Sequence, residues 1–295
     1  MKGWLVTNGF LKSDKFNTLY SFFQNSAKKL NIDLRLIPTD ALICESTDNF
    51  HNFPRPEFVI FWDKDVMLAH RLERAGFKLF NCAHAVEVCD SKSLTAFTLA
   101  GVVPMPKTVH CPKTFPAVGY TDLGFVRRAV EILGLPLVVK ESYGSFGEQV
   151  YLANTVEETE LLANKLAGKD FVFQQFIAES AGRDIRVNVV GGKVVNAVLR
   201  QSANGDFRSN VTLGGTMTPY ELSTEERTLA ETVCQNLGLD FAGVDILQSN
   251  NAPLLCEVNS NPQFKSTFDC TGVDLSLIIL QHVANKISKC SNRKN

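Results

Sequence analysis

The sequence lacks the cysteine and histidine patterns that mark zinc sites and disulfide frameworks. Its eight cysteines include no C-x-x-C pair, and its five histidines show no metal-ligand spacing. Zinc knuckles and secreted disulfide scaffolds depend on such spacing. We therefore expect reduced thiols that pack as small apolar groups, and we assign no catalytic role to a histidine.

Long apolar runs and an excess of either charge are also missing. No run approaches the roughly 18 apolar residues needed to cross a bilayer. The 30 Lys and Arg residues nearly balance the 31 Asp and Glu residues, which leaves no global basic field for nucleic acid or an anionic membrane. With 45% hydrophobic and 21% charged residues, the composition predicts a soluble globular protein in the cytoplasm, with neither nucleic acid nor membrane as a partner.

The G-x-x-x-x-G-K-[ST] sequence of P-loop proteins is absent as well, but another lysine and glycine pattern is present. In LVVKESYGSFG, residues 137–147, Lys140 ends an apolar strand before a turn that contains Gly144 and Gly147. Glycine lets backbone N–H groups approach a phosphate closely, and an ammonium at the strand end can neutralise it. A lysine before a glycine turn is also common in ordinary hairpins, so this signal is weak alone.

The first 85 or so residues alternate short apolar runs with helical patterns. This βαβ-like rhythm predicts a small parallel sheet flanked by helices. Ligands of such sheets gather at the carboxyl ends of the strands, so the loop at residues 7–9 is a candidate substrate edge. The total length of 295 residues allows two domains, or three small ones.

A second segment begins near Cys89 and contains two predicted helices, at residues 91–102 and 122–134. From Phe171 onward, alternating strands, a helix at residues 223–238 and a closing helix at residues 275–287 predict an antiparallel sheet with helical cover.

The stretch from residue 243 to residue 262 predicts a β-hairpin with acids inside its apolar strands. Alternation puts Glu257 and Asn259 on one face, and a turn centred near Asn251 places Asp245 opposite Glu257 on that face. Two facing carboxylates repel unless a cation lies between them, and three hard oxygen ligands suit Mg²⁺. The alternative is that Asp245 is a solvated strand residue and that Asn259 begins a turn.

Charged residues of both signs also occur on neighbouring predicted strands. Asp184 and Arg186 alternate on one strand face, and the following segment adds Arg200, Asp206, Arg208, Ser209 and Asn210. Arginines that point into the same pocket as the oxygen ligands would form a site for multiply charged anions. The alternative is surface ion pairing, which explains most isolated Arg and Asp pairs.

The order of these motifs resembles the ATP-grasp superfamily, and within it the RimK-like carboxylate–amine ligases, over residues 85–290. The resemblance is carried by Lys92, VVK, QQFI, GRDIRVNVVG, GDFRSN, GVDIL and CEVNSNP in this order. It implies an α/β (α+β) fold: a Rossmann-like pre-ATP-grasp domain at residues 1–88, and two α+β subdomains at residues 89–172 and 173–295 that enclose the nucleotide.

The resemblance also implies roles for individual residues. Lys92 and Lys140 would bind the ATP phosphates, and the loop of Gly144, Ser145 and Gly147 would cover them. The other roles follow the order of the motifs: Gln175 and Phe176 at the adenine hinge, Asp184 near the ribose, and Arg208, Ser209 and Asn210 at the phosphate and substrate edge. One departure is Gln174-Gln175, since family members commonly carry Gln-Glu there, and the amide lacks the charge.

The implied metal site consists of Asp245, Glu257 and Asn259, which would hold two Mg²⁺ ions with Glu257 bridging, and Mn²⁺ as a substitute. Arg186 and Arg200 would stabilise developing oxyanions. The implied reaction joins a carboxylate of a small molecule, peptide or protein to an amine, such as that of glutamate. It passes through an acylphosphate and gives ADP and phosphate, and the protein would be a homo-oligomer.

Two alternatives remain open at this point. A D-alanine:D-alanine-ligase-like enzyme would have the same fold but matches GDFRSN less well. A non-catalytic ATP-binding module of ATP-grasp fold is the other, because a fold by itself does not fix a function.

Overall fold

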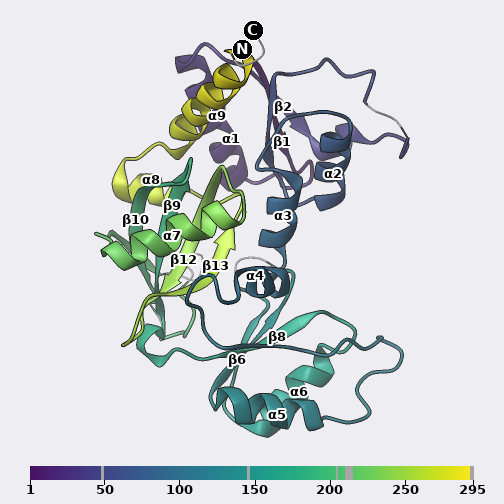
Figure 1. Cartoon of the computed structure of the whole chain (residues 1–295), viewed down its shortest axis with the longest axis vertical. Coiled ribbons are helices and arrows are strands. Elements are labelled where there is room, and N and C mark those ends of the chain that lie inside the picture. Colours follow the sequence, from purple (N-terminus) through teal and green to yellow (C-terminus); the bar gives the residue numbers. More distant parts are fainter. Residues whose placement is uncertain (48–49, 145–146, 204, 210–214, 293–295) are drawn as a thin grey trace.

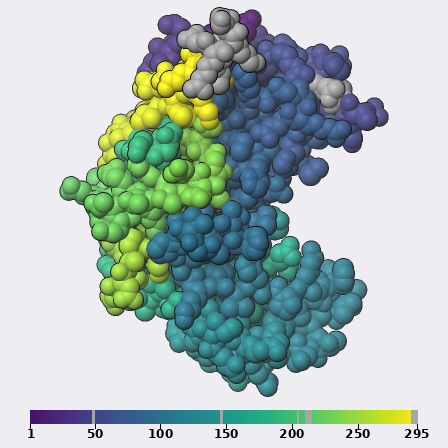
Figure 2. All heavy atoms as spheres, viewed as in Figure 1, coloured from purple at the N-terminus to yellow at the C-terminus, as the bar shows by residue number. Residues whose placement is uncertain are grey.

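Three sheets follow one another along the chain in a computed structural model that describes residues 1–47, 50–144, 147–203, 205–209 and 215–292 (Figure 1). Figure 2 shows that the middle segment of the chain forms a lobe, which is set off from the rest of the molecule by a hollow. No helix in the described ranges is long and apolar enough to cross a membrane.

The N-terminal sheet is entirely parallel, as the alternating pattern predicts. Its strand order is β2 (Asp33–Pro38), β1 (Lys2–Thr7), β3 (Phe58–Trp62) and β4 (Leu79–Phe80). Both faces of β1 and β3 are buried, because helices α1 (Asp14–Lys29) and α2 (Val66–Arg74) cover the sheet. The carboxyl ends of the strands therefore meet at one open edge.

The middle sheet is antiparallel and forms the separate lobe. Its order is β5 (Thr108–His110), β8 (Phe171–Gln175), β6 (Leu137–Glu141) and β7 (Val150–Ala153). Helices α5 (Gly124–Leu133) and α6 (Val156–Lys165) bury an apolar face against it, with Phe171 and Phe173 at the centre. The opposite face of this sheet lines the cavity that is described below.

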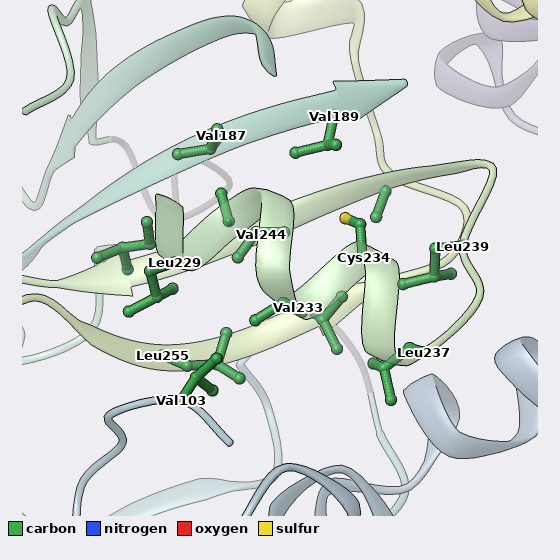
Figure 3. Packing of buried hydrophobic residues seen from close by; sticks show 14 of the residues in the cluster. Val103, Val187, Val189, Leu229, Val233, Cys234, Leu237, Leu239, Val244 and Leu255 are labelled. Atoms are coloured by element: carbon green, nitrogen blue, oxygen red, sulfur yellow. The ribbon is translucent and has the colours of Figure 1, made fainter. Parts of the chain in front are cut away.

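The C-terminal sheet has the order β11 (Thr216–Pro219), β10 (Lys193–Gln201), β9 (Arg183–Val190), β12 (Phe241–Leu247) and β13 (Leu254–Asn259). All of its pairs are antiparallel, as predicted. Helix α7 (Thr224–Asn236) covers one face; Figure 3 shows Leu229 and Val233 of this helix packed toward Val244 and Leu255. A capping box between Ser223 and Glu226 fixes the start of α7.

The remaining helices connect these layers. Helices α3 (Ala83–Asp90) and α4 (Lys92–Leu99) lead from the first sheet to the second, while α8 (Lys265–Thr271) and α9 (Leu275–Asn292) follow the third. Helix α9 packs beside α1 and shares its apolar core (Figure 1). The closing helix predicted at residues 275–287 is present and begins at Leu275, but it ends later, at Asn292.

Sequence patterns did not predict α3, α6 or α8. Helix α8 has seven residues, too few for a periodic signal, and α6 begins with the polar run after Thr155. The division into three domains stays a proposal. Residues 88 and 172 lie inside α3 and β8, so we propose boundaries after Asp90 and after Gln175 instead.

Candidate active site

A cavity of about 610 Å³ lies where the three sheets face one another. Every predicted site residue within the described ranges lines it: Lys92, Lys140, Gly144, Gly147, Gln175, Phe176, Asp184, Arg186, Arg200, Arg208, Ser209, Asp245, Glu257 and Asn259. Ser145 and Asn210 lie outside the described residues. The fold thus brings together groups that are spread over more than 160 positions of the sequence.

The cavity floor is a row of charges across the C-terminal sheet. Arg200 of β10 pairs in register with Asp184 of β9, and Arg186 of β9 pairs with Asp245 of β12. Asp184 and Arg186 lie two positions apart on β9, so their side chains point to the same face. Strand pairing between distant segments therefore builds alternating positive and negative groups.

Each pair in this row is a buried ion pair with two hydrogen bonds. Arg200 Nε donates to Asp184 Oδ1 at 2.6 Å, and Arg186 Nη2 donates to Asp245 Oδ2 at 2.9 Å. Arg200 also reaches Asp245, with its Nη2 at 3.0 Å from Oδ2. Burial alone would raise the pKa of Asp245, but the two guanidinium groups outweigh it and hold that pKa below its ordinary value.

The next strand adds the oxygen ligands that the hairpin pattern predicted. Glu257 of β13 pairs directly with Asp245, and Asn259 follows on the same face. The side chains of Glu257 and Asn259 make no hydrogen bond to other described residues, so their oxygens are open to the cavity. Asp245 already accepts from two arginines and keeps unused capacity mainly on Oδ1.

This donor set fits a Mg²⁺ ion. Two carboxylates and one amide oxygen on a cavity wall are the hard ligands that Mg²⁺ prefers, and the open cavity leaves room for water and phosphate. The described residues contain no group of three His, Cys, Asp or Glu side chains placed to hold a metal by themselves. In such a site the third protein ligand would be the amide oxygen of Asn259.

Two lysines face Glu257 from the opposite wall. Lys92 is the first residue of α4, and Lys140 lies on β6 with its side chain buried. Burial lowers the pKa of Lys92, while the charge of Glu257 opposes that effect. The two ammonium groups also repel each other, and an anion with several negative charges bound beside them would offset this repulsion.

A loop of the middle lobe lies over this wall. Lys92 Nζ lies 3.4 Å from the carbonyl oxygen of Gly144, and Arg208 Nη1 donates to the carbonyl of Gly147 at 2.8 Å. Gly144 has a φ of 148°, and a Cβ there would meet the side chain of Gln149 at 2.3 Å. Only glycine fits this turn without displacing Gln149.

An apolar slot lies at the end of β8. Phe176 and Ile177 follow Gln175 and line the cavity with Val138 and Leu247. Gln175 Oε1 lies 3.4 Å from the backbone N–H of Lys107, while Gln174 Nε2 donates to Thr108 Oγ1 at 2.9 Å. Apolar side chains beside a few polar groups are the lining that small-molecule sites commonly have.

The sequence analysis missed several residues of the cavity wall. Cys256 is the extra residue of a β-bulge next to Asp245, and its Sγ lies 3.8 Å from Lys140 Nζ. Burial raises the pKa of this thiol to about 11, so it is not a ready nucleophile. Trp62, Asp63 and Gln263 also line the cavity, and only the predicted substrate edge after β1 hinted at this side.

Comparison with known proteins agrees with this geometry. Residues 102–283 match the family model described as the RimK-like ATP-grasp domain. The β-citrylglutamate synthase B of Danio rerio is 33% identical over 234 residues, which are 79% of this chain and 56% of that protein. A probable α-L-glutamate ligase of Parasynechococcus marenigrum is 42% identical over 156 residues, 52% of this chain and 34% of that protein.

The matches therefore span about half, or less, of the length of these curated relatives. Among solved structures, the D-alanine–D-alanine ligase of Bacillus anthracis complexed with ATP aligns with a TM-score of 0.74 at 17% identity, and the alignment covers 100% of both chains. At that identity the likeness establishes the ATP-grasp fold alone. Together with the family match over most of the chain, the comparisons show that this chain belongs to the RimK-like ATP-grasp family.

Proposed function

We propose that the protein is an ATP- and Mg²⁺-dependent ligase that joins a carboxylate to an amine and releases ADP and phosphate. The observation that carries this proposal is the cavity itself, where Lys92 and Lys140 face Glu257 and the buried arginine row. A site of this charge pattern favours phosphoryl transfer to an anionic substrate. The names of the glutamate ligase and citrylglutamate synthase relatives support the same class of reaction.

In this proposal the nucleotide lies between the middle lobe and the C-terminal sheet. The slot beside Gln175 and Phe176 takes the base, and Lys92, Lys140 and the Gly144–Gly147 turn hold the phosphates. Asp184 lies near the ribose, but its carboxylate is already bound to Arg200. We therefore infer that Asp184 mainly orients Arg200 and contributes little to binding of the ribose.

Asp245, Glu257 and Asn259 would hold two Mg²⁺ ions, or Mn²⁺ ions in their place. Bound there, the metal would supply positive charge to the triphosphate.

Arg186 and Arg200 lie on the cavity floor and can bind the reacting groups from that side. Nε and Nη2 of Arg186 and Arg200 bind acids, while neither Nη1 makes a hydrogen bond to another described residue. These two donors are available to a phosphoryl or carboxylate oxygen.

The chemistry needs no nucleophile from the protein. A substrate carboxylate attacks the γ-phosphate, ADP leaves, and an amine then displaces phosphate from the acylphosphate to form an amide. The high pKa of the Cys256 thiol agrees with this route, because a neutral thiol is a poor acyl carrier. What the chain contributes is orientation, charge and exclusion of water.

We propose glutamate or a similar amino acid as the amine substrate, in line with the relatives' names. The carboxylate partner is a small molecule, a peptide or a protein terminus. The seven described cysteines that are free support a reducing compartment such as the cytoplasm. Exposed Leu94 and Phe97 on α4 offer a contact face for the proposed homo-oligomer.

The test is phosphate release from MgATP with a panel of amino acids, dicarboxylates and peptides. Turnover to ADP that depends on both a carboxylate and an amine supports the ligase. Stoichiometric ATP binding without turnover would favour a non-catalytic binding module, and turnover with D-alanine alone would favour a D-alanine ligase activity. AMP as the product would exclude the proposed reaction.

A further inference from the structure

Asp63 lines the cavity but has no role in the reaction proposed above. It directly follows β3, at the carboxyl end of the parallel N-terminal sheet, and lines the cavity opposite the nucleotide wall. Ligands of parallel sheets bind at this edge. Its side chain is 6% exposed, which is unusual for a carboxylate.

The hydrogen bonds of Asp63 satisfy it only in part. Oδ1 accepts from the backbone N–H groups of Lys64 at 2.7 Å and Asp65 at 2.8 Å, so both donors converge on one oxygen. The side chain of Asn8 adds a further bond. No lysine, arginine or histidine forms an ion pair with Asp63 in the described part of the chain, and Lys64 pairs with Asp90 instead, at 2.9 Å.

Lys15, Lys64 and Lys265 also line the cavity, but none of the three forms an ion pair with Asp63, so this carboxylate has no direct countercharge among the described residues. Burial raises the pKa of Asp63, and the nearby charge of Asp65 adds to that effect against the hydrogen bonds. A buried carboxylate without a countercharge is costly, and a cationic ligand would remove the cost.

A second acceptor of this cavity has no donor. Oε1 of Gln263 is buried and has no hydrogen-bond partner among the described residues, and Gln263 lines the same cavity. The neighbouring residues touch, because the rings of Trp62 and Phe264 lie 5.9 Å apart, edge to face. Asp63 and Gln263 are thus the sequence neighbours of two rings in contact, and both line the cavity.

We propose that Asp63 binds the ammonium group of an amino-acid substrate, with Gln263 as its second acceptor. An ammonium carries three donors and one positive charge, which matches a carboxylate without a countercharge and an amide oxygen without a donor. This inference rests on the proposed ligase function and names the residue that selects its amino-acid substrate. The ammonium belongs either to the amino acid whose nitrogen attacks, in which case one of its protons passes to the Asp63 carboxylate and the neutral amine then attacks, or to an amino acid whose carboxylate is activated.

The competing explanation is that Asp63 only shapes the turn into α2. Asp63→Asn separates the two explanations, because the amide oxygen can still accept from Lys64 and Asp65 while the charge is lost. Asp65→Asn is the matched control. Asp65 caps α2 by accepting from the Leu68 N–H at 2.9 Å, belongs to the same turn and does not line the cavity.

The experiment is calorimetry on the full chain loaded with Mg²⁺ and a non-hydrolysable ATP analogue. Each of the twenty standard L-amino acids is titrated, and the one that binds is compared with its analogue lacking the amino group, such as glutarate for L-glutamate. We expect wild type and Asp65→Asn to bind the same amino acid. We expect Asp63→Asn to bind it at least about tenfold more weakly and to keep its affinity for the nucleotide, as lost charge-assisted bonds require.

Three results would overturn the inference. They are equal affinity in Asp63→Asn, equal affinity for the analogue without an amino group, and nucleotide binding with no amino acid bound. Failure of wild type to bind the nucleotide would instead contradict the proposed function. Turnover then distinguishes the two sources of the ammonium. ADP release with this amino acid alone assigns it as the activated carboxylate, and a requirement for a second carboxylate assigns it as the amine.

Discussion

At the scale of single residues, Glu257 is the group on which the cavity's charge balance depends. It faces Lys92, pairs across the ladder with Asp245, and makes no hydrogen bond to the rest of the described chain. We expect Glu257→Gln to lower turnover by at least about a hundredfold, because it preserves volume but removes the charge that a metal needs. Steady-state ADP release measures this, and circular dichroism checks the fold.

Activity within a few-fold of wild type would show that Glu257 does not hold a metal. Glu226→Gln is a useful comparison, because Glu226 is also a buried acid of this sheet region but belongs to the capping box of α7. It should alter stability and leave nucleotide binding unchanged.

Lys140 is the second residue with a specific expectation. Among the described residues, the hydrogen-bond partner of its buried ammonium is the Cys256 thiol, which is a weak acceptor, so a phosphate would gain a full charge-assisted bond. We expect Lys140→Ala to weaken ATP binding by about ten- to a hundredfold. Calorimetry with a non-hydrolysable analogue measures it, and unchanged affinity would make Lys140 an ordinary strand residue.

At the scale of elements, the C-terminal sheet depends on its buried charge row. Asp245 balances two arginines that come from β9 and β10, so removing its charge leaves the buried guanidinium of Arg186 without an ion pair among the described residues and Arg200 with Asp184 alone. We expect Asp245→Asn to destabilise the fold by about 3–5 kcal/mol, the usual cost of breaking a buried pair. Urea unfolding measures the loss.

The contact between α9 and the start of β12 should be sensitive to acid. Asp240 is buried and accepts from His282 at 2.7 Å and Lys286 at 2.6 Å, both on α9. Burial would raise its pKa, yet these bonds outweigh burial and lower the pKa below the ordinary value. A lowered pKa stabilises the fold above the unfolded-state pKa, and this contribution is lost as pH falls through the folded-state value.

Unfolding by urea between pH 6 and pH 3 tests this contact. Wild type should lose more stability across that range than Asp240→Asn, which has no carboxylate to protonate. Parallel curves for the two proteins would show that Asp240 contributes nothing to the acid sensitivity of the molecule.

At the scale of the whole molecule, the cavity needs all three sheets, and this arrangement predicts the order of the chemistry. The carboxylate substrate with MgATP but without amine should give an acylphosphate, which hydroxylamine converts to a hydroxamate. The reason is that the described cavity offers cations together with acidic and amide oxygens, while burial raises the pKa of the Cys256 thiol and makes it a poor acyl carrier. Pyrophosphate release, or an acylated Cys256, would contradict it.

The sequence by itself determined what local pattern can determine. Alternation in the β12–β13 hairpin set Asp245 opposite Glu257, and the spacing of Asp184 and Arg186 set them on one face of β9. Motif order identified many of the residues that line the cavity, because each motif is short and lies at a strand end or turn, but it did not identify Asp63, Cys256 or Gln263.

Only the tertiary structure decided which charges meet. Because the strand order is β10-β9-β12-β13, Arg200 pairs with Asp184, and both Arg186 and Arg200 pair with Asp245. The spacing of these residues in the sequence does not predict which arginine pairs with which aspartate. The bulge at Cys256 and the contact of Trp62 with Phe264 likewise depend on segments far apart in the chain. These pairings affect stability strongly because the charges are buried: a charge removed from water costs free energy unless the fold places an opposite charge beside it.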